Sequence, residues 1–525
     1  MTHDNSDQRA KWGSQMEYYL CTIGYAVGFG SLWRFPYLVY ANGGGAFLFP
    51  YLVCFFIMGV PIFYLESALG QMFQEGIAKC FEKIRKAFRG IGVAPVIMCY
   101  FIATFYNLFL AYGFIFLWDS FSYPLPWKVE NPINGKLWDE KYFYNEVLEI
   151  TDNMLNIGGF NSKVIIGSIV SFIFVYICII KGIKTSGKVA YVTALAPYVL
   201  LFILLLRGLF LDGAIEGIGY LFTVDWSKVW TTEIWFKAAS QVLFQLSVGF
   251  GTLIAFSSYK HQSEPILHSA IVLPTANVLT GFLCAFTVFT YMGHMAWVGG
   301  VEIHELPLAG PDLVFTAYPA ALTLIPFSNF WSVLFFIMIF FLGIDSEFAL
   351  LETVASHFED EKLTFFGKKL PMEIVRLILT VALFVSGFIL YTRAGFYYFP
   401  FYDTYSIDVP VTVNTAIECY VITWVYGWDK LGAMIQEHTG EIVPPYIVIM
   451  TKYACIPMLL FLAAGAILNQ FVQLFSLPWW FAIIGFLLTA LPLLQLWYNY
   501  SKYKDEPTVK DDAEKPLIEL SDYHE

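Results

Sequence analysis

Apolar segments as long as a membrane-crossing helix follow one another along almost the whole chain. About 20 apolar residues in a helix span the hydrocarbon core of a bilayer. Segments of this kind lie near residues 15–37, 44–72, 90–118, 164–180, 189–211, 235–259, 266–293, 330–356, 373–391, 399–426, 445–468 and 478–500. Only 14% of the residues are charged, 58% are hydrophobic and the mean hydropathy is +0.62, which excludes an ordinary water-soluble globular protein. The sequence therefore predicts an all-α polytopic membrane protein with twelve transmembrane helices.

The first apolar segment contains a stretch that an uninterrupted helix would avoid. Gly24 to Pro36 holds three glycines, an arginine and a proline. In hydrocarbon every backbone N–H and C=O needs a partner, so a broken helix is tolerated only where it is buried in protein or lines a cavity. The motif Val27-Gly28-Phe29-Gly30 recurs as Val248-Gly249-Phe250-Gly251. Matched breaks in two halves predict the central site of a transporter, whereas close helix packing is the alternative for either stretch alone.

The distance between the two motifs divides the chain into repeats of five segments each. Because five is an odd number, the second repeat enters the membrane from the opposite side, which predicts a 5+5 inverted repeat with broken helices 1 and 6. Lys and Arg gather in alternate connections, and this bias places both termini in the cytoplasm. The predicted parts are an N-tail at 1–14, a transporter domain at 15–503 with repeats at about 15–211 and 232–428 and two further helices at about 445–500, and an acidic C-tail at 504–525.

Several classes of protein are excluded by the remaining composition. The net charge of −12 comes largely from loops and the C-tail and argues against nucleic acid as a partner. All eight cysteines fall in or beside apolar segments, so no disulfide framework is expected. No signal peptide, phosphate loop, nucleophile elbow or metalloprotease motif is present, and the chain is not predicted to be an enzyme. The expected partners are the lipid bilayer and a small-molecule substrate.

Charged residues within or beside the apolar segments are candidates for gates. Arg34 lies near the outer end of the first segment, where a charge at bilayer depth needs a partner or a vestibule. Asp403 offers a partner that would close the cavity from outside, and snorkelling of Arg34 to the interface is the alternative. On the inner side Arg9 could pair with Asp360, although spacing alone favours a simple positive-inside residue.

The eighth segment carries two carboxylates and a hydroxyl in Gly343-Ile344-Asp345-Ser346-Glu347. A hard cation such as Na⁺ takes oxygen ligands from carboxylates, hydroxyls and backbone carbonyls freed at a helix break. Asp345 is therefore a candidate cation ligand, with a protonated or arginine-paired structural carboxylate as the alternative. Glu66 and Glu418 have no break beside them, so we expect them to form structural hydrogen bonds to backbone amides. Three isolated polar residues lie inside apolar segments, at Tyr106, Asn107 and Asn277. Such groups more often form interhelical hydrogen bonds than ligand contacts.

A series of motifs in a fixed order resembles one known family. The motifs are Trp33-Arg34-Phe35-Pro36-Tyr37, Asn42-Gly43-Gly44-Gly45-Ala46-Phe47, Gly59-Val60-Pro61, Leu69-Gly70-Gln71, Phe105-Tyr106-Asn107, Ser186-Gly187-Lys188, Gly343-Ile344-Asp345-Ser346 and Trp424-Val425-Tyr426-Gly427. Over about residues 9–500 the chain resembles the neurotransmitter:sodium symporters, whose fold is that of the bacterial leucine transporter. The resemblance implies sodium-coupled uptake by alternating access.

Carried over by motif, the resemblance implies a set of substrate contacts. The carboxylate of an amino acid would meet the amides of Phe29 and Gly30 and the hydroxyl of Tyr106. The ammonium would meet the carbonyls of Ala26, Phe244 and Gln245 and the hydroxyl of Ser247. The substrate side chain would be bounded by Ile102, Phe244, Phe250, Ser346 and Leu350. Phe244 and Tyr106 would form an inner lid beneath Arg34 and Asp403, and Arg9, Asp360 and Tyr259 would form the inner gate.

The resemblance also implies ion sites. A second sodium site maps onto the carbonyls of Gly24, Val27 and Leu342 and the side chains of Asp345 and Ser346. A first sodium site maps onto Ala26, Ser31, Gln245 and Asn277, with Ser31 in place of the family's asparagine and Gln245 in place of its Ser or Thr. The chloride site maps onto Tyr51, Gln241, Gln245, Asn277 and Gly281. Two hydroxyl groups of that site are lost, at Gln245 and Gly281, which argues against a chloride requirement.

The resulting hypothesis is a sodium-coupled symporter of neutral α-amino acids in the plasma membrane. Biogenic amine carriers have an aspartate where Gly28 stands, so the substrate here is expected to bring its own carboxylate. Phe29 is expected to shorten the cavity, which disfavours longer substrates. A carrier of γ-amino acids or betaine-like osmolytes is therefore kept as the alternative. A non-transporting, receptor-like protein of the same fold is a further alternative, suited by the changes at Ser31 and Gln245. A channel would need a continuous polar stripe, which the segments lack.

Overall fold

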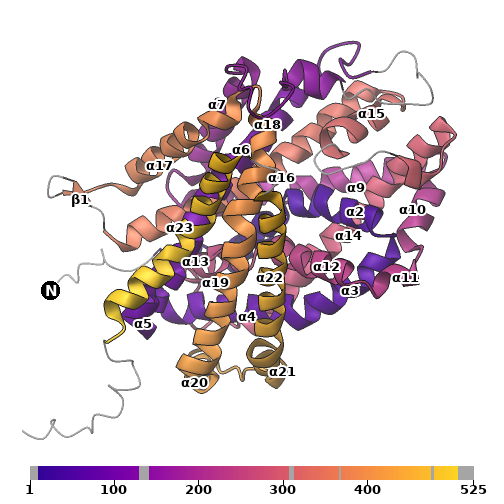
Figure 1. Cartoon of the computed structure of the whole chain (residues 1–525). Helices are drawn as coiled ribbons and strands as arrows, with labels where there is room; N and C mark the ends of the chain where they lie inside the picture. The colour runs from indigo at the N-terminus through magenta and orange to yellow at the C-terminus, as the bar shows by residue number, and fades with distance from the viewer. Residues whose placement is uncertain are drawn as a thin grey trace, which may run out of the picture.

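The computed structural model describes residues 10–128, 141–306, 313–362, 364–365, 368–474 and 478–505. The described residues form one bundle of helices (Figure 1). In addition, two short strands, β1 (Thr364–Phe365) and β2 (Lys368–Lys369), pair antiparallel and stand apart from the bundle. The helical class predicted from the sequence is therefore confirmed.

Short 3₁₀- and π-helical turns, labelled η, occur between the α-helices along the chain. The helical elements of the first half are α1 (Gln15–Ala26), η2 (Gly30–Arg34), α2 (Phe35–Ala41), α3 (Gly45–Cys54), η3 (Phe55–Gly59), α4 (Val60–Phe73), α5 (Ile77–Ile84), η4 (Lys86–Phe88), α6 (Arg89–Asp119), η5 (Tyr142–Val147), α7 (Ser162–Ile179), α8 (Ile183–Thr193), α9 (Ala196–Leu209), α10 (Ala214–Phe222) and α11 (Trp226–Val229). Those of the second half are α12 (Thr232–Leu246), α13 (Thr252–Ser257), α14 (Leu267–Gly299), η6 (Ile303–Glu305), η7 (Leu313–Ala317), α15 (Tyr318–Thr323), α16 (Ser328–Asp360), α17 (Met372–Ser386), η8 (Phe388–Tyr391), α18 (Gly395–Asp403), η9 (Thr404–Asp408), α19 (Val409–Tyr420), η10 (Val421–Gly427), α20 (Trp428–Thr439), α21 (Pro445–Ile449), η11 (Met450–Ala454), α22 (Cys455–Leu474) and α23 (Trp479–Tyr503).

Within the described residues, eight continuous helical stretches are long and apolar enough to cross a membrane. They are 45–73, 86–119, 162–179, 183–209, 267–299, 328–360, 445–473 and 479–503. The other four predicted segments are built from shorter helices. The segment at 15–37 falls on α1, η2 and α2, and that at 235–259 on α12 and α13. The segment at 373–391 falls on α17 and η8, and that at 399–426 on the run from α18 to η10.

The core of the bundle is formed by α6 and α16, which pack along each other. In the most apolar stretch of α16, 78% of the residues are buried by the protein, against 22% in α23. Helix α1 packs on α8 and α16, whereas α12 packs on α3 and α13 packs on α4. The first interrupted helix therefore lies against the central pair, and the last helix lies at the periphery.

Both breaks predicted from the glycines are present. Helix α1 ends at Ala26, and helical structure resumes in η2 at Gly30. Helix α12 ends at Leu246, and α13 begins at Thr252. The intervening residues Gly249 and Gly251 have φ angles of 85° and 75°, which only glycine adopts at little cost. These glycines therefore allow the backbone to leave the helix inside the bundle.

Two further expectations from the sequence are met. Glu66, on α4, accepts a hydrogen bond of 2.5 Å from the backbone N–H of Gly249, as expected for a structural carboxylate. The eight cysteines, all within the described residues, are buried and form no disulfide. The bond from Gly249 satisfies one of the amides that the break of α12 leaves without a helical partner.

Candidate substrate and ion site

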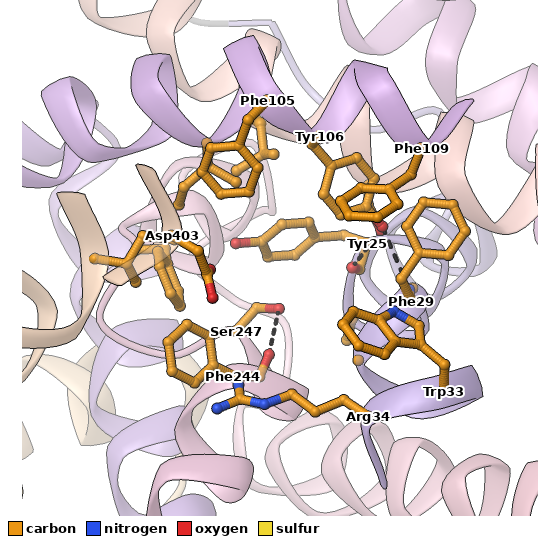
Figure 2. Close-up of a pocket in the computed structure, with 18 of the residues that line it drawn as sticks. Tyr25, Phe29, Trp33, Arg34, Phe105, Tyr106, Phe109, Phe244, Ser247 and Asp403 are labelled. Atoms are coloured by element: carbon orange, nitrogen blue, oxygen red, sulfur yellow. Dashed lines mark hydrogen bonds between the residues drawn. The ribbon is translucent and has the colours of Figure 1, made fainter. Parts of the chain in front are cut away.

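A cavity of about 420 Å³ lies between the two helix breaks. Aromatic rings dominate its wall, and Figure 2 shows them converging from α6, α12 and the segment that follows α1. The aromatic and aliphatic lining residues include Tyr25, Phe29, Trp33, Ile102, Phe105, Tyr106, Phe109, Phe244, Phe250, Leu350 and Phe399. Polar groups lie at fewer positions, which include Arg34, Lys237, Ser247, Ser346, Asp403, the hydroxyls of Tyr25, Tyr37 and Tyr106, and the backbone around Gly28 and Gly30. Such a wall suits a small molecule with an apolar body and a few polar groups.

The break after α1 brings its backbone close to α6 and α16. The backbone N–H of Phe29 donates to the hydroxyl of Tyr106 at 3.4 Å. A Cβ atom placed on Gly28 would lie 2.5 Å from Ser346 Oγ and 2.7 Å from Tyr106 Oη. At Gly30, by contrast, a Cβ atom would meet nothing within 4 Å. This segment therefore packs tightly against Ser346 and Tyr106 at Gly28 and leaves open space at Gly30.

The break after α12 offers groups of the opposite polarity. Ser247 has a left-handed backbone with φ of 53°, and both its N–H and its hydroxyl donate to the carbonyl of Phe244, at 3.2 and 3.3 Å. The last carbonyls of a helix lack helical partners and carry partial negative charge. The cavity thus has hydrogen-bond donors on the α1 side and carbonyl acceptors on the α12 side, which matches the two ends of a zwitterion.

At one end of the cavity the two predicted gate residues face each other without pairing. Arg34 Nη2 donates to Ser240 Oγ at 3.4 Å, and the guanidinium lies over the Phe244 ring. Asp403 also lines the cavity, and Figure 2 shows its carboxylate apart from the Arg34 guanidinium, with the Phe244 ring drawn between them. Among the ion pairs of the described residues none within 4 Å joins Arg34 to Asp403. The gate pair predicted from the sequence is therefore not formed in the structure.

A further cation at this end was missed by the sequence analysis. Lys237 lines the cavity, and its Nζ lies 2.5 Å from Glu233 Oε1 and 3.2 Å from Asn42 Oδ1. Its position on α12, seven residues before Phe244, places both on one helix face and is the signal that could have identified it.

The N-terminal segment is held against α13 and the connection that follows it. Trp12 donates from its backbone to the carbonyl of Tyr259 at 3.1 Å and from its indole to the carbonyl of Phe256 at 2.9 Å. Arg9 lies outside the described residues, so its predicted pairing with Asp360 stays a prediction. The backbone carbonyl of Asp360, at the end of α16, accepts a hydrogen bond from Lys79.

The predicted second sodium site brings a buried carboxylate to the end of α1. Asp345 is 1% exposed, and its Oδ1 has no hydrogen-bond partner among the described residues. Its Oδ2 occupies the space beside Gly24, where a Cβ atom would lie only 2.5 Å away. Ser346 Oγ donates to the carbonyls of Tyr25 and Leu342, at 3.1 and 3.5 Å. A carboxylate with an unpaired oxygen beside helix-terminal carbonyls is an oxygen-only set that suits Na⁺.

The residues of the predicted first sodium site are linked to one another instead. Ser31 Oγ donates to Asn277 Oδ1 at 3.3 Å, and Asn277 Nδ2 donates to the backbone carbonyl of Gln245 at 2.6 Å. These are the interhelical hydrogen bonds expected for Asn277. The carboxamide of Gln245 bonds to Tyr51, to Gln241 and to the backbone carbonyl of Asn277.

One more carboxylate beside the ion site has no partner. Glu347 is fully buried, and neither of its oxygens has a hydrogen-bond partner among the described residues. The pair of acids at 345 and 347 was noted in the sequence, but Glu347 was given no role. Both amide atoms of Asn107 also lack a partner there, contrary to the interhelical bond expected for it.

Comparison with known proteins identifies the chain's relatives. The model of the Sodium:neurotransmitter symporter family matches residues 9–502. GABA transporter 2 of Rattus norvegicus, named as sodium- and chloride-dependent, is 32% identical over 95% of this chain and 87% of its own length. The creatine transporter of Torpedo marmorata is 34% identical over 93% of this chain and 84% of its own length. The sodium- and chloride-dependent creatine transporter 1 of Oryctolagus cuniculus is 33% identical, with coverages of 91% and 80%. With its apolar helices and its two helix breaks, the chain is a multi-pass membrane protein that belongs to the sodium:neurotransmitter symporter family.

Proposed function

We propose that this protein is a sodium-coupled symporter of neutral α-amino acids. The observation that carries the proposal is the polarity of the cavity, with the Tyr106 hydroxyl and the open backbone at Gly30 on one side and the carbonyl end of α12 on the other. In an α-amino acid one carbon separates the carboxylate from the ammonium. The two groups can therefore bind to the two sides of the cavity at the same depth. The aromatic walls receive an apolar side chain.

Gly28 and Phe29 support a short zwitterion. The contacts of Gly28 with Ser346 and Tyr106 leave no room for a side-chain carboxylate, so the substrate supplies its own. The Phe29 ring lies 5.1 Å from Tyr106 and 5.7 Å from Phe109, centre to centre, and fills space that a longer molecule would need. GABA and creatine, named for the relatives, define the alternative of longer substrates.

The transport cycle follows from the two ends of the cavity. We assign twelve transmembrane helices in a 5+5 inverted repeat, with both termini in the cytoplasm and the protein in the plasma membrane. In that orientation the separated Arg34 and Asp403 face outward, and Trp12 seals the inward end. The arrangement corresponds to an outward-facing state that closes over the substrate before the inner end opens.

Sodium is co-transported cargo in this proposal and binds at Asp345. A cation there would draw the carbonyls of Gly24 and Val27 toward the carboxylate and so order the backbone that leads to Phe29. Moving one charge through 100 mV is worth about 2.3 kcal/mol, and a tenfold sodium gradient adds about 1.4 kcal/mol. One ion therefore supports accumulation of roughly 500-fold.

The test is uptake by the full chain in proteoliposomes. A panel of α-amino acids, GABA, creatine and betaine is offered with a sodium gradient or with choline in place of sodium. We expect sodium-dependent uptake of apolar α-amino acids, lost in Tyr106→Phe and retained in Tyr112→Phe, which changes a buried tyrosine on the same helix outside the cavity. Uptake of GABA or creatine alone would favour the alternative, and sodium-independent uptake would overturn the proposal.

A further inference from the structure

Two of the relatives, GABA transporter 2 and creatine transporter 1, are named as chloride-dependent, so the predicted chloride position can be tested for fit. An anion in a protein interior is held by convergent hydrogen-bond donors that have no other acceptor. The candidate donors are the hydroxyl of Tyr51 and the side-chain amide of Gln241. Both residues are fully buried, as is Gln245 at 1% exposure.

Both donors already have an acceptor within the protein. Tyr51 Oη donates to Gln245 Oε1 at 2.8 Å, and Gln241 Nε2 donates to the same oxygen at 3.2 Å. The other end of the Gln245 carboxamide is also engaged, because its Nε2 donates to the backbone carbonyl of Asn277 at 3.3 Å. The carboxamide oxygen thus stands at the point where these donors converge. The residues present do not fit a chloride ion.

Gly281 explains why a side chain as long as glutamine fits there. A Cβ atom placed on Gly281 would lie 2.5 Å from Gln245 Nε2. No real Cβ contact is that short, so any side chain at 281 would force the carboxamide to move. Because residue 281 has no side chain, it leaves the space that the carboxamide of Gln245 occupies. The glutamine at 245 therefore depends on the glycine at 281.

We infer that the Gln245 carboxamide permanently replaces a bound anion, and that transport by this protein needs no chloride. The inference rests on the proposed transport function, but the site itself can be tested without transport. The amide satisfies the donors as an anion would, and it adds no net charge. No ion has to enter or leave this position during the cycle.

The first experiment uses the wild-type chain. Sodium-driven amino-acid uptake is measured with chloride and with gluconate at constant sodium, and no loss of uptake is expected in gluconate. In parallel, the melting temperature of the purified protein is measured in sodium gluconate and in sodium chloride. An ion that binds only the folded state raises that temperature, so no chloride-specific rise is expected. Loss of uptake in gluconate, or a chloride-specific rise that Tyr51→Phe removes, would overturn the inference.

The second experiment reverses the arrangement with the double variant Gln245→Ser/Gly281→Ser. It removes the acceptor that Tyr51 and Gln241 share, while Gln241 Nε2 keeps its bond of 3.0 Å to the Gly30 carbonyl, and it supplies two hydroxyls. Hydrogen bonds to a charged group are worth about 1.5–3 kcal/mol, so chloride should raise uptake by about tenfold or more. The matched control is Gln470→Ser/Gly219→Ser, which makes the same exchanges at a distant buried glutamine and at a glycine with free space around it.

A folded double variant without any response to chloride would overturn the role given to Gln245. If the double variant does not fold, Gly281→Ala decides, because its Cβ atom should displace the carboxamide and lower the melting temperature. An unchanged melting temperature in Gly281→Ala would overturn the packing on which the inference depends. If the reconstituted wild type takes up no substrate at all, the proposed function has failed, and the melting temperatures still test the chloride site.

Discussion

The guanidinium carbon of Arg34 lies 4.2 Å from the centre of the Phe244 ring. A cation over an aromatic face is stabilised by about 0.5–2 kcal/mol, whereas a bidentate bond from arginine to a carboxylate is stronger and directional. Arg34 therefore rests on the inner lid while the cavity is open, and moving onto Asp403 would close it. In the proposed closed state, the partner of this side chain would be Asp403.

Arg34→Lys should damage transport although the charge is kept. A lysine ammonium is a point charge that cannot hold Asp403 bidentately, and it covers the Phe244 ring less well. We expect lower uptake and weaker apparent substrate affinity in proteoliposomes. Ser240→Ala, which removes only the 3.4 Å hydrogen bond of Arg34, serves as control and should stay close to wild type. Equal kinetics in Arg34→Lys and wild type would contradict the gate role.

Gly28→Asp should abolish uptake of zwitterionic amino acids. The new carboxylate would collide with Ser346 and Tyr106 and would face the substrate carboxylate, and like charges in a dry site repel by several kcal/mol. Gly28→Ala separates size from charge and should lower uptake through the collision alone. Gly219→Ala, at a glycine with nothing within 4 Å, is the matched control. Wild-type uptake by Gly28→Asp would show that the assigned substrate pose is wrong.

Asp345→Asn should remove the sodium dependence of uptake, because the only formal charge in the assigned cation site is lost. Titrating sodium in the wild type should give a Hill coefficient near one, since the residues of the first site bond to one another. Glu347→Gln is the control, as it neutralises a buried carboxylate two residues away. A coefficient near two, or full sodium dependence in Asp345→Asn, would count against this assignment.

The ion pair between Glu352 and Arg376 should matter for folding. Two hydrogen bonds of 3.0 Å join the side chains, which are 1% and 6% exposed. Removing one partner strands a buried charge and costs about 3–5 kcal/mol. Glu352→Gln should therefore lower the melting temperature strongly, and Glu352→Leu/Arg376→Met should recover much of the loss. Arg393→Met, which breaks an exposed pair with Glu149, should cost less than about 1 kcal/mol. Similar losses for both single variants would refute the prediction.

Stability should rise with pH through the titration of Lys260. This residue lies in the connection after α13, and burial lowers the pKa of its ammonium from 10.5 to about 8. The unfolded chain then binds more protons than the folded chain between pH 8 and 10.5, so folding becomes more favourable as pH rises across that window, by about 3 kcal/mol in total. Thermal unfolding from about pH 7 to about pH 10 measures this effect. Lys260→Met should lack that rise, and an identical pH profile would contradict it.

The helix breaks could be predicted from the sequence because their signal is local. Glycines such as Gly249 and Gly251, repeated in two halves of an apolar chain, leave few structures that satisfy the backbone. The role of Glu66 followed from the same reasoning, since a buried acid without a break of its own needs amide donors. Glu418, for which the same bond was expected, has no hydrogen-bond partner at Oε1 among the described residues. The candidate gates Arg34 and Asp403 were identified from the charged residues themselves, whereas the nearness of Asp345 to Gly24 came from the family resemblance.

Side-chain directions could not be predicted in the same way. The carboxamide of Gln245 turns toward Tyr51 because Gly281, in another helix, leaves space there, and no pattern along one segment encodes that space. Arg34 rests on Phe244 because the cavity is open, which is a property of one conformation. Lys237 was overlooked because a single lysine near a helix end is usual at a membrane interface.

The hydrogen bond between Glu66 and Gly249 has a mechanical consequence. It joins the centre of the unwound stretch between α12 and α13 to the middle of α4, at a point that lies outside both helices. Force applied at either end of this stretch reaches α4 through that bond. The break is therefore anchored to α4 at its centre, so that any movement of α4 would carry with it the substrate groups that lie at the break.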